Sequence, residues 1–328
     1  MIRARAVVIT EPGGPEVLAI EEREVRDPGP GEVLVAVAAA GLNRADTLQR
    51  RGLYPAPQGV PSDVPGLELA GTVARVGPGV RLFSEGDLVM AITAGGGMCT
   101  HAVLHERELI RVPKGVPLVA AAALPEVFLT AFDALFLQAQ LRLGEVALVH
   151  AVASGVGTAA LQLNGVAGVT TVGTSRSSEK LERCRELGLE HPVLTRDGFE
   201  AQDVLGDFPG GVDVVLDTVG AKYLASNLAV LAPLGRVVTI GLVGGLRAEL
   251  DLGRMLRKRA RWFGSVLRAR PLEEKAALAR RFEAEIVPLF EDGRLRPVID
   301  EVLPMESVGE AHRRMEANET FGKLVLRW

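Results

Sequence analysis

The chain has 328 residues, 48% of them hydrophobic, which is enough to bury a large core and suggests two domains rather than one. A formal net charge of −4 at pH 7 argues against a general polyanion partner, and we interpret the one dense basic run, 254–261, as a solvated surface. No apolar run reaches the roughly 18 residues of a membrane span, and the first residues lack a signal-peptide pattern. We therefore expect a cytoplasmic protein with no membrane partner and no general affinity for nucleic acid.

The first 124 residues are predicted to be rich in β-strands. Alternating apolar runs at 3–9, 32–38 and 69–76 are separated by turns containing Pro and Gly. Short strands joined by tight turns indicate a partly open barrel. A helical pattern over 127–135 then leads into a second domain.

Strands and helices alternate between residues 125 and 263. Strands are predicted at 146–150, 169–174, 212–219 and 236–241, with helical patterns between them that include 179–187 and 224–231. This alternation predicts an α/β domain with a doubly wound parallel sheet.

The last part of the chain is predicted to rejoin the first. A helix is expected at 272–290, and the alternating run 322–328 is expected to return to the barrel as a strand. The predicted domains are therefore 1–124 together with 264–328, and 125–263.

A glycine-containing turn, Ser154-Gly155-Val156-Gly157, follows the strand at 146–150 and opens a helix. Gly155 and Gly157 let the backbone approach a phosphate, and the unpaired amides of the first helical turn attract its negative charge. The usual dinucleotide fingerprint has a third glycine, so this pattern alone is weak. A second strand one helix length later supports a βαβ unit and a pyrophosphate site.

The end of the second strand indicates which dinucleotide is bound. NAD sites place Asp or Glu there to bind the ribose 2′-hydroxyl, whereas this chain has Ser175, Arg176, Ser177 and Lys180. Hydroxyls and cations suit a 2′-phosphate, so NADPH is favoured over NADH. Glu179 is interpreted as a solvated helix residue.

Several short segments together carry a resemblance to a known family. They are 41–46, 52–55, 65–71, 123–126, 129–132, 154–162 and 315–318, followed by Gly322 and Lys323. With these segments the chain resembles the zinc-free quinone oxidoreductases of the medium-chain dehydrogenase/reductase superfamily, nearest the tumour-suppressor-inducible branch, with zeta-crystallin more distant. The resemblance implies a GroES-like barrel as the catalytic domain and a Rossmann domain that binds NADPH.

The resemblance also bears on metal binding. Zinc-dependent members of the superfamily have Cys where Asn43 stands and His where Leu67 stands, and Leu67 cannot bind zinc. Cys99 and His101 form a pair that lacks a third and a fourth ligand. We therefore expect no metal. Without this Lewis acid, the expected acceptor is an intrinsically electrophilic quinone or enone.

Three residues are implied by the resemblance to line the acceptor and nicotinamide pocket. Tyr54 would donate to a developing oxyanion, Asn43 would orient acceptor or cofactor, and Thr130 would contact the nicotinamide. A packing role for Tyr54 and a turn-stabilising role for Asn43 and Asp46 remain open.

The expected cofactor contacts combine the residue patterns above with the resemblance. They are Ser154, Gly155, Val156, Gly157, Gly173, Ser175, Arg176, Ser177, Lys180, Arg196, Gly241, Leu242, Val243 and Asn318. Arg196 lies where relatives often place a Tyr beside the adenosine phosphate. Two alternatives are open: Arg196 makes a charge-assisted contact with this phosphate, or the selectivity for NADPH is weak. His101 likewise lies where relatives often have Tyr, so acceptor preference is open too.

The predicted function is an NADPH:quinone oxidoreductase that transfers hydride in the interdomain cleft. We expect a homodimer joined edge to edge near 236–246, with a tetramer also open. An enone or alkenal reductase is the first alternative. A non-catalytic NADPH-binding sensor, or an RNA-binding protein that uses Arg257, Lys258 and Arg259, is the second. His150 and the strand acids Asp213 and Asp217 are expected to have structural roles.

Overall fold

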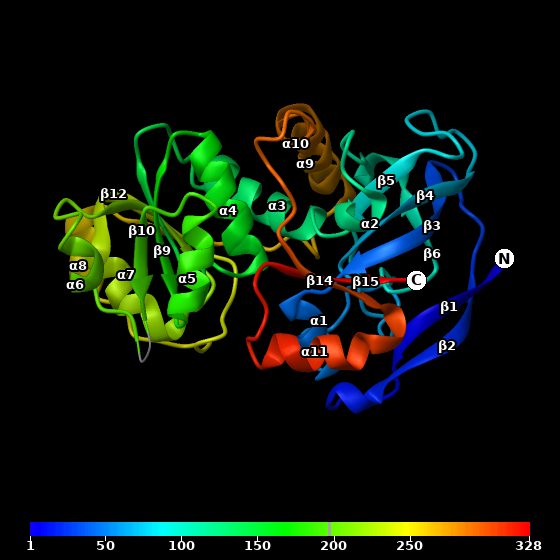
Figure 1. Ribbon diagram of the computed structural model, residues 1–328, viewed down its shortest axis with the longest axis horizontal. Helices are drawn as coiled ribbons and strands as arrows, with labels where there is room; N and C mark the ends of the chain where they lie inside the picture. Colours follow the sequence, from blue (N-terminus) through cyan, green and yellow to red (C-terminus); the bar gives the residue numbers. More distant parts are fainter. Residues whose placement is uncertain (196–197) are drawn as a thin grey trace. The chain divides into compact units, whose positions relative to one another are not determined.

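The computed structural model describes residues 1–195 and 198–328, and the chain divides into two units (Figure 1). One unit comprises Met1–Leu129 with Leu267–Trp328, and the other comprises Thr130–Val266. These limits lie within a few residues of the boundaries predicted at 124 and 263.

The first unit is built on a seven-stranded sheet with the order β14, β15, β3, β4, β5, β7, in which β6 also pairs with β3. The strands are β3 (Glu32–Gly41), β4 (Glu68–Val76), β5 (Leu88–Ile92), β6 (His101–His105), β7 (Ile110–Arg111), β14 (Ile299–Pro304) and β15 (Lys323–Arg327). A separate antiparallel pair consists of β1 (Ile2–Ile9) and β2 (Leu18–Val25). The antiparallel pairing of β15 with β3 confirms that the end of the chain returns to the barrel.

Alternation along β3 explains how the first unit forms its core. Val33, Val35 and Val37 lie on one face of the strand and pack with Leu69 and Val89 of the neighbouring strands. A second buried cluster lies between the sheet and α11 (Val308–Glu316). These two cores fix the strand ends from which the candidate site is built.

The helices of the first unit include one that differs from the prediction. They are α1 (Arg44–Arg50), α2 (Leu118–Ala121), α3 (Pro125–Phe132, which runs into the second unit), α9 (Leu272–Glu285), α10 (Val287–Glu291) and α11. The helix predicted at 272–290 is present but divided into two, because the helix is interrupted at Ile286, where φ is −110°. Pro288 has no amide proton for the helical ladder, so it suits the first turn of a new helix.

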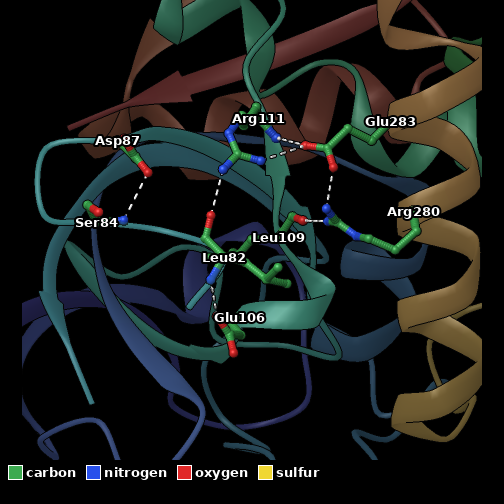
Figure 2. Close-up of polar contacts among 8 residues, drawn as sticks. All are labelled: Leu82, Ser84, Asp87, Glu106, Leu109, Arg111, Arg280 and Glu283. Carbon is green, nitrogen blue, oxygen red and sulfur yellow. Dashed lines mark hydrogen bonds and ion pairs between the residues drawn. The ribbon is translucent and has the colours of Figure 1, made fainter. Parts of the chain in front are cut away.

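Side chains of α9 contact β7, the strand at one end of the seven-stranded sheet (Figure 2). The Glu283 carboxylate accepts a hydrogen bond from the backbone amide of Arg111 at 3.1 Å and also contacts Arg280. Arg280 donates in turn to the carbonyl of Leu109, and Arg111 donates to the carbonyl of Leu82 at 2.5 Å. The edge strand β7 is therefore bonded to side chains of α9.

The second unit contains a six-stranded parallel sheet with the order β10, β9, β8, β11, β12, β13. The strands are β8 (Val146–Val149), β9 (Thr170–Ser175), β10 (His191–Leu194), β11 (Val212–Asp217), β12 (Leu231–Thr239) and β13 (Arg261–Gly264). Numbered within the unit, the order is 3-2-1-4-5-6, that of dinucleotide-binding domains. The predicted doubly wound fold is confirmed.

Helices connect these strands and cover the sheet. They are the π-helix η3 (Asp133–Gln138), α4 (Gly155–Val166), α5 (Ser178–Arg185), α6 (Gln202–Leu205), α7 (Leu224–Val230) and α8 (Leu252–Lys258). Helix α4 contacts β8 and β9, whereas η3 contacts β11 and β12. In the part of the chain that the structure describes, no helix is long and apolar enough to span a bilayer.

The edge of the parallel sheet is not where the sequence predicted it. Strand β12 lies between β11 and β13, so the predicted edge at 236–246 is wrong, and β13 forms the edge instead. The four residues Arg261–Gly264 are too few to give a strand pattern in the sequence.

Candidate active site

The first unit contains a buried polar cluster around Glu68, the first residue of β4. Glu68 Oε1 accepts from Asn43 Nδ2 at 2.9 Å and lies 2.6 Å from Lys323 Nζ. Lys323 also donates to Asn43 Oδ1 at 2.7 Å and to the carbonyl of Leu42 at 2.6 Å. Glu68, Asn43 and Lys323 are all buried. The cluster therefore fixes both ends of the Asn43 carboxamide.

Asp46 stabilises the loop that precedes this carboxamide. Its Oδ2 accepts from the backbone amide of Asn43 at 2.8 Å, as in a capping box at the start of α1, and its Oδ1 accepts from the amide of Gly66 at 2.9 Å. Burial raises the pKa of Asp46 to about 6, although both amide hydrogen bonds act to lower it. The turn-stabilising alternative for Asn43 and Asp46 is therefore supported.

Tyr54 lies against the guanidinium of Arg268, which is 4.8 Å from the centre of its ring. Arg268 is held by the carbonyls of Ala94 at 2.6 Å and Tyr54 at 3.1 Å, and by Gln49 Oε1 at 2.5 Å. Burial raises the pKa of the half-buried Tyr54 phenol, and the positive charge of Arg268 opposes this change. Tyr54 therefore keeps its proton at neutral pH and can donate a hydrogen bond.

The third predicted acceptor-site residue, Thr130, lies in the second unit. It is half-buried on α3, whereas Asn43 and Tyr54 belong to the first unit. A shared pocket for these three residues stays a prediction.

The glycine-containing turn adopts the geometry expected of a phosphate site. Ser154 is the N-cap of α4, and its Oγ accepts from the amide of Gly157 at 3.1 Å. A Cβ on Gly157 would lie 2.4 Å from the carbonyl oxygen of Ala151, so only glycine fits here. Within the described residues, the first-turn amides of Gly155 and Val156 have no hydrogen-bond acceptor. These amides are free to bind an anion.

The end of β9 presents the residues predicted to bind the 2′-phosphate. Ser175 is buried and its Oγ accepts from the amide of Ser177, which in turn caps α5 by accepting from the amide of Lys180. Arg176 is exposed, and Lys180 is half-buried. Close packing explains Gly173, because a Cβ there would lie 2.8 Å from the Leu189 side chain.

The remaining predicted cofactor residues lie in three places. Gly241, Leu242 and Val243 follow the carboxyl end of β12, with Leu242 and Val243 exposed. The parallel sheet brings this turn to the same edge as Ser154–Gly157 and Ser175–Lys180. Asn318 belongs to the first unit, where its Oδ1 accepts from Arg44 at 2.9 Å. Arg196 lies outside the described residues.

His150 and Asp217 have structural partners, as predicted. His150 is completely buried between Thr174 Oγ1 at 3.0 Å and Asn227 Oδ1 at 2.7 Å, and burial lowers its pKa. Asp217 accepts from the amides of Val219 and Gly220 and from the Thr239 hydroxyl. Asp213 accepts similarly from the amide of Val146 at 2.9 Å.

The residues around Glu68 do not fit a catalytic zinc ion. Leu67 is buried and has no donor atom, Asn43 is bonded at both ends of its carboxamide, and the ammonium of Lys323 already lies against Glu68. No further metal-binding side chain joins Cys99 and His101, since no three His, Cys, Asp or Glu side chains of the described residues are grouped to hold a metal ion.

Sequence reasoning assigned no chemistry to four residues of this region: Glu68, Glu126, Arg268 and Lys323. Three of them lie in the segments that carry the family resemblance, which was the only available signal. The sequence contains no signal for Arg268, because its partner Tyr54 is 214 residues away.

Two family models match parts of the chain. Residues 29–114 match the alcohol dehydrogenase GroES-like domain, and residues 187–326 match a model described as a zinc-binding dehydrogenase. A quinone oxidoreductase of Pseudomonas aeruginosa is 35% identical over 98% of this chain and 99% of its own length. The rat synaptic vesicle membrane protein VAT-1 homolog is 34% identical over 98% of this chain and 83% of its own length.

Solved structures agree with these matches. A quinone oxidoreductase of Pseudomonas syringae has a TM-score of 0.88 and 31% identity, covering 99% of this chain and 100% of its own. The JamJ enoyl reductase has a TM-score of 0.88 and 26% identity, with 99% of both chains covered. A mycobacterial protein complexed with NADPH has a TM-score of 0.87 and 28% identity, covering 99% of this chain and 100% of its own.

Proposed function

Because the chain belongs to the medium-chain dehydrogenase/reductase superfamily, we propose that it is an NADPH-dependent, zinc-free reductase of quinones. The observation that carries the proposal is the buried Asn43–Glu68–Lys323 cluster, which leaves no set of donor atoms for a Lewis acid. The acceptor is therefore one that needs no activation by a metal, and quinones are such acceptors.

The second unit supplies the proposed cofactor site. The first-turn amides of α4 bind the pyrophosphate, and Arg176, Ser177 and Lys180 bind the 2′-phosphate of the adenosine ribose. The mycobacterial neighbour that is complexed with NADPH supports a nicotinamide cofactor of this type. When bound, the reduced nicotinamide supplies a hydride.

The first unit supplies the proposed acceptor site. Tyr54 donates a hydrogen bond to the oxygen of the acceptor on which negative charge develops, and the guanidinium of Arg268 holds the ring in place. Asn43 acts as a positioning residue, since its carboxamide is bonded at both ends within the cluster. Thr130 is proposed to contact the nicotinamide.

A second candidate function is the reduction of an enone. It is favoured by the likeness to the JamJ enoyl reductase, and it requires the same hydride and the same stabilised oxyanion. The proposal of an RNA-binding protein is less well supported, because Lys258 of the basic run donates to the carbonyls of Ala229 and Leu231.

A homodimer joined through β13 is proposed in place of the predicted edge near β12. Strand β13 ends the parallel sheet, and exposed apolar side chains occur in the loop after β12 and on α8. They are Leu246, Leu252 and Leu256. A cytoplasmic location stays a prediction.

The proposal is tested by following oxidation of NADPH and of NADH with 1,4-benzoquinone, a larger ortho-quinone and an enone. Quinone turnover with a higher kcat/KM for NADPH than for NADH supports it. Turnover of the enone alone moves the assignment to the second candidate. Tight NADPH binding without turnover of any acceptor contradicts both and supports a sensor.

A further inference from the structure

Glu126 is an acid next to the buried cluster around Glu68. It lies in the first turn of α3, and its backbone amide donates to Glu68 Oε2 at 2.8 Å. Glu68, Asp46 and Lys323 are each almost completely buried, whereas Glu126 is mostly buried but keeps partial exposure to solvent. Glu126 is therefore the most exposed of these three acids.

The carboxyl of Glu126 has no fixed bonding partner in the part of the chain that the structure describes. Among the described residues, none donates a hydrogen bond to its oxygens or forms an ion pair with it. Glu68, by contrast, accepts from Asn43 and the amide of Glu126 and pairs with Lys323. A half-buried carboxyl without internal partners is available to an external one.

The charges around Glu126 favour its neutral form. Burial raises its pKa to about 8, and the negative charges of Glu68 and Asp46 act in the same direction, against Lys323 and Arg268. The charge of Glu126 also raises the pKa of Tyr54, so the two side chains interact electrostatically. At neutral pH the carboxyl therefore holds a proton, and it interacts electrostatically with the proposed oxyanion donor Tyr54.

We propose that Glu126 is the proton donor of the reduction, an inference that rests on the proposed function and deepens it. An enone gains a hydride at its β-carbon and a proton from the Glu126 carboxyl at its α-carbon, so that the product is the saturated ketone. A quinone gains the same hydride and proton and leaves as the hydroquinone. The Glu126 carboxylate then takes up one proton from the medium, so that each turnover consumes one NADPH and one proton and yields NADP⁺ and the reduced acceptor.

The first test is the pH dependence of single-turnover oxidation of NADPH. In the natural protein the rate falls as the pH rises through about 8, because the carboxyl loses its proton. Glu126→Gln lowers the rate at pH 7 by about a hundredfold and removes this fall, while Glu126→Asp retains part of both. Glu108→Gln is the matched control, since Glu108 is also half-buried but pairs with Lys275 at 3.4 Å.

The second test needs no activity and uses the protein without cofactor. Its infrared difference spectrum between pH 6 and pH 10 should contain the band of a protonated carboxyl that titrates near pH 8 and that Glu126→Gln removes. Fluorescence titration with NADPH should give the same Kd for both proteins, which shows that the variant is folded.

The outcomes separate this inference from the function on which it rests. A natural protein that oxidises NADPH with none of the acceptors overturns the proposed function, and the donor role falls with it, whether or not the infrared band is present. A natural protein that is active, with Glu126→Gln keeping its rate and pH profile, overturns only the donor role. If Glu126→Gln does not fold, the natural protein alone decides: the donor role is overturned when its infrared spectrum has no carboxyl band that titrates near pH 8.

Discussion

Lys323 Nζ lies 2.6 Å from Glu68 Oε1, and both side chains are almost completely shielded from solvent. The strands that carry them, β15 and β4, both pair with β3. The ion pair thus joins the carboxyl end of the chain to the first part of the barrel. It also holds Asn43, since both partners bond to that carboxamide.

Removing the cation should destabilise the protein strongly. Lys323→Met leaves the Glu68 charge buried without a counter-ion, and we expect the free energy of unfolding to fall by about 3–5 kcal/mol. Urea unfolding measures this change. The double variant Lys323→Met with Glu68→Gln should regain most of the loss, because the unpaired Glu68 charge is gone. A loss below about 1 kcal/mol, the value of an exposed pair, would contradict the role of the cluster.

Asp46 should make stability depend on pH. Its pKa rises from an ordinary 3.8 to about 6 in the folded protein, so the folded state holds this proton more tightly than the unfolded chain does. The contribution of Asp46 is therefore full below pH 3.8 and is lost as the pH rises through about 6.

Unfolding free energies of the natural protein and Asp46→Asn, measured across this window, check the prediction. The natural protein should lose stability relative to the variant as the pH rises. Asp63→Asn, which alters a half-exposed carboxylate paired with Arg23, serves as the control. Parallel pH curves for the natural protein and Asp46→Asn would show that Asp46 contributes nothing.

Two glycines of α4 should respond oppositely to alanine. Gly157→Ala places a methyl group 2.4 Å from the Ala151 carbonyl oxygen, which distorts the turn, and we expect at least a tenfold loss in NADPH affinity, or about 1.4 kcal/mol. A Cβ on Gly165 meets no atom within 4 Å, so Gly165→Ala should leave affinity unchanged and stabilise the helix by about 1 kcal/mol. Equal affinities for all three proteins would contradict the phosphate site.

The choice of cofactor should depend on Arg176. Arg176→Glu replaces a cation beside the proposed 2′-phosphate with an anion, and the affinity for NADPH should fall at least tenfold while that for NADH changes little. Arg183→Glu makes the same charge change in the last turn of α5 and serves as the control. If both variants weaken NADPH equally, only general electrostatics is at work.

Local patterns allowed much of the fold to be predicted from the sequence. The strand and helix of the glycine-containing turn follow from an apolar run, two glycines and a capping serine, all within a few residues. The return of β15 to the barrel followed from its alternation. The break at Ile286 was missed because the apolar pattern continues across it, although Pro288 was present as a signal.

The buried polar cluster around Glu68 could not be predicted, because it depends on contacts between distant segments. Lys323 and Asn43 are 280 residues apart, and their contact exists only once β15 pairs with β3. The raised pKa of Glu126 likewise depends on burial and on the charge of Glu68, which a residue pattern does not contain.

Hydride transfer from the nicotinamide is tested most directly by single-turnover oxidation of NADPH deuterated at C4 with 1,4-benzoquinone. The two stereoisomers of the label are compared with unlabelled NADPH at the same pH. We expect one stereoisomer to react more slowly and the other at the unlabelled rate, because a bound cofactor transfers hydride from one face only. Equal rates for all three cofactors, or no oxidation at all, would contradict the account.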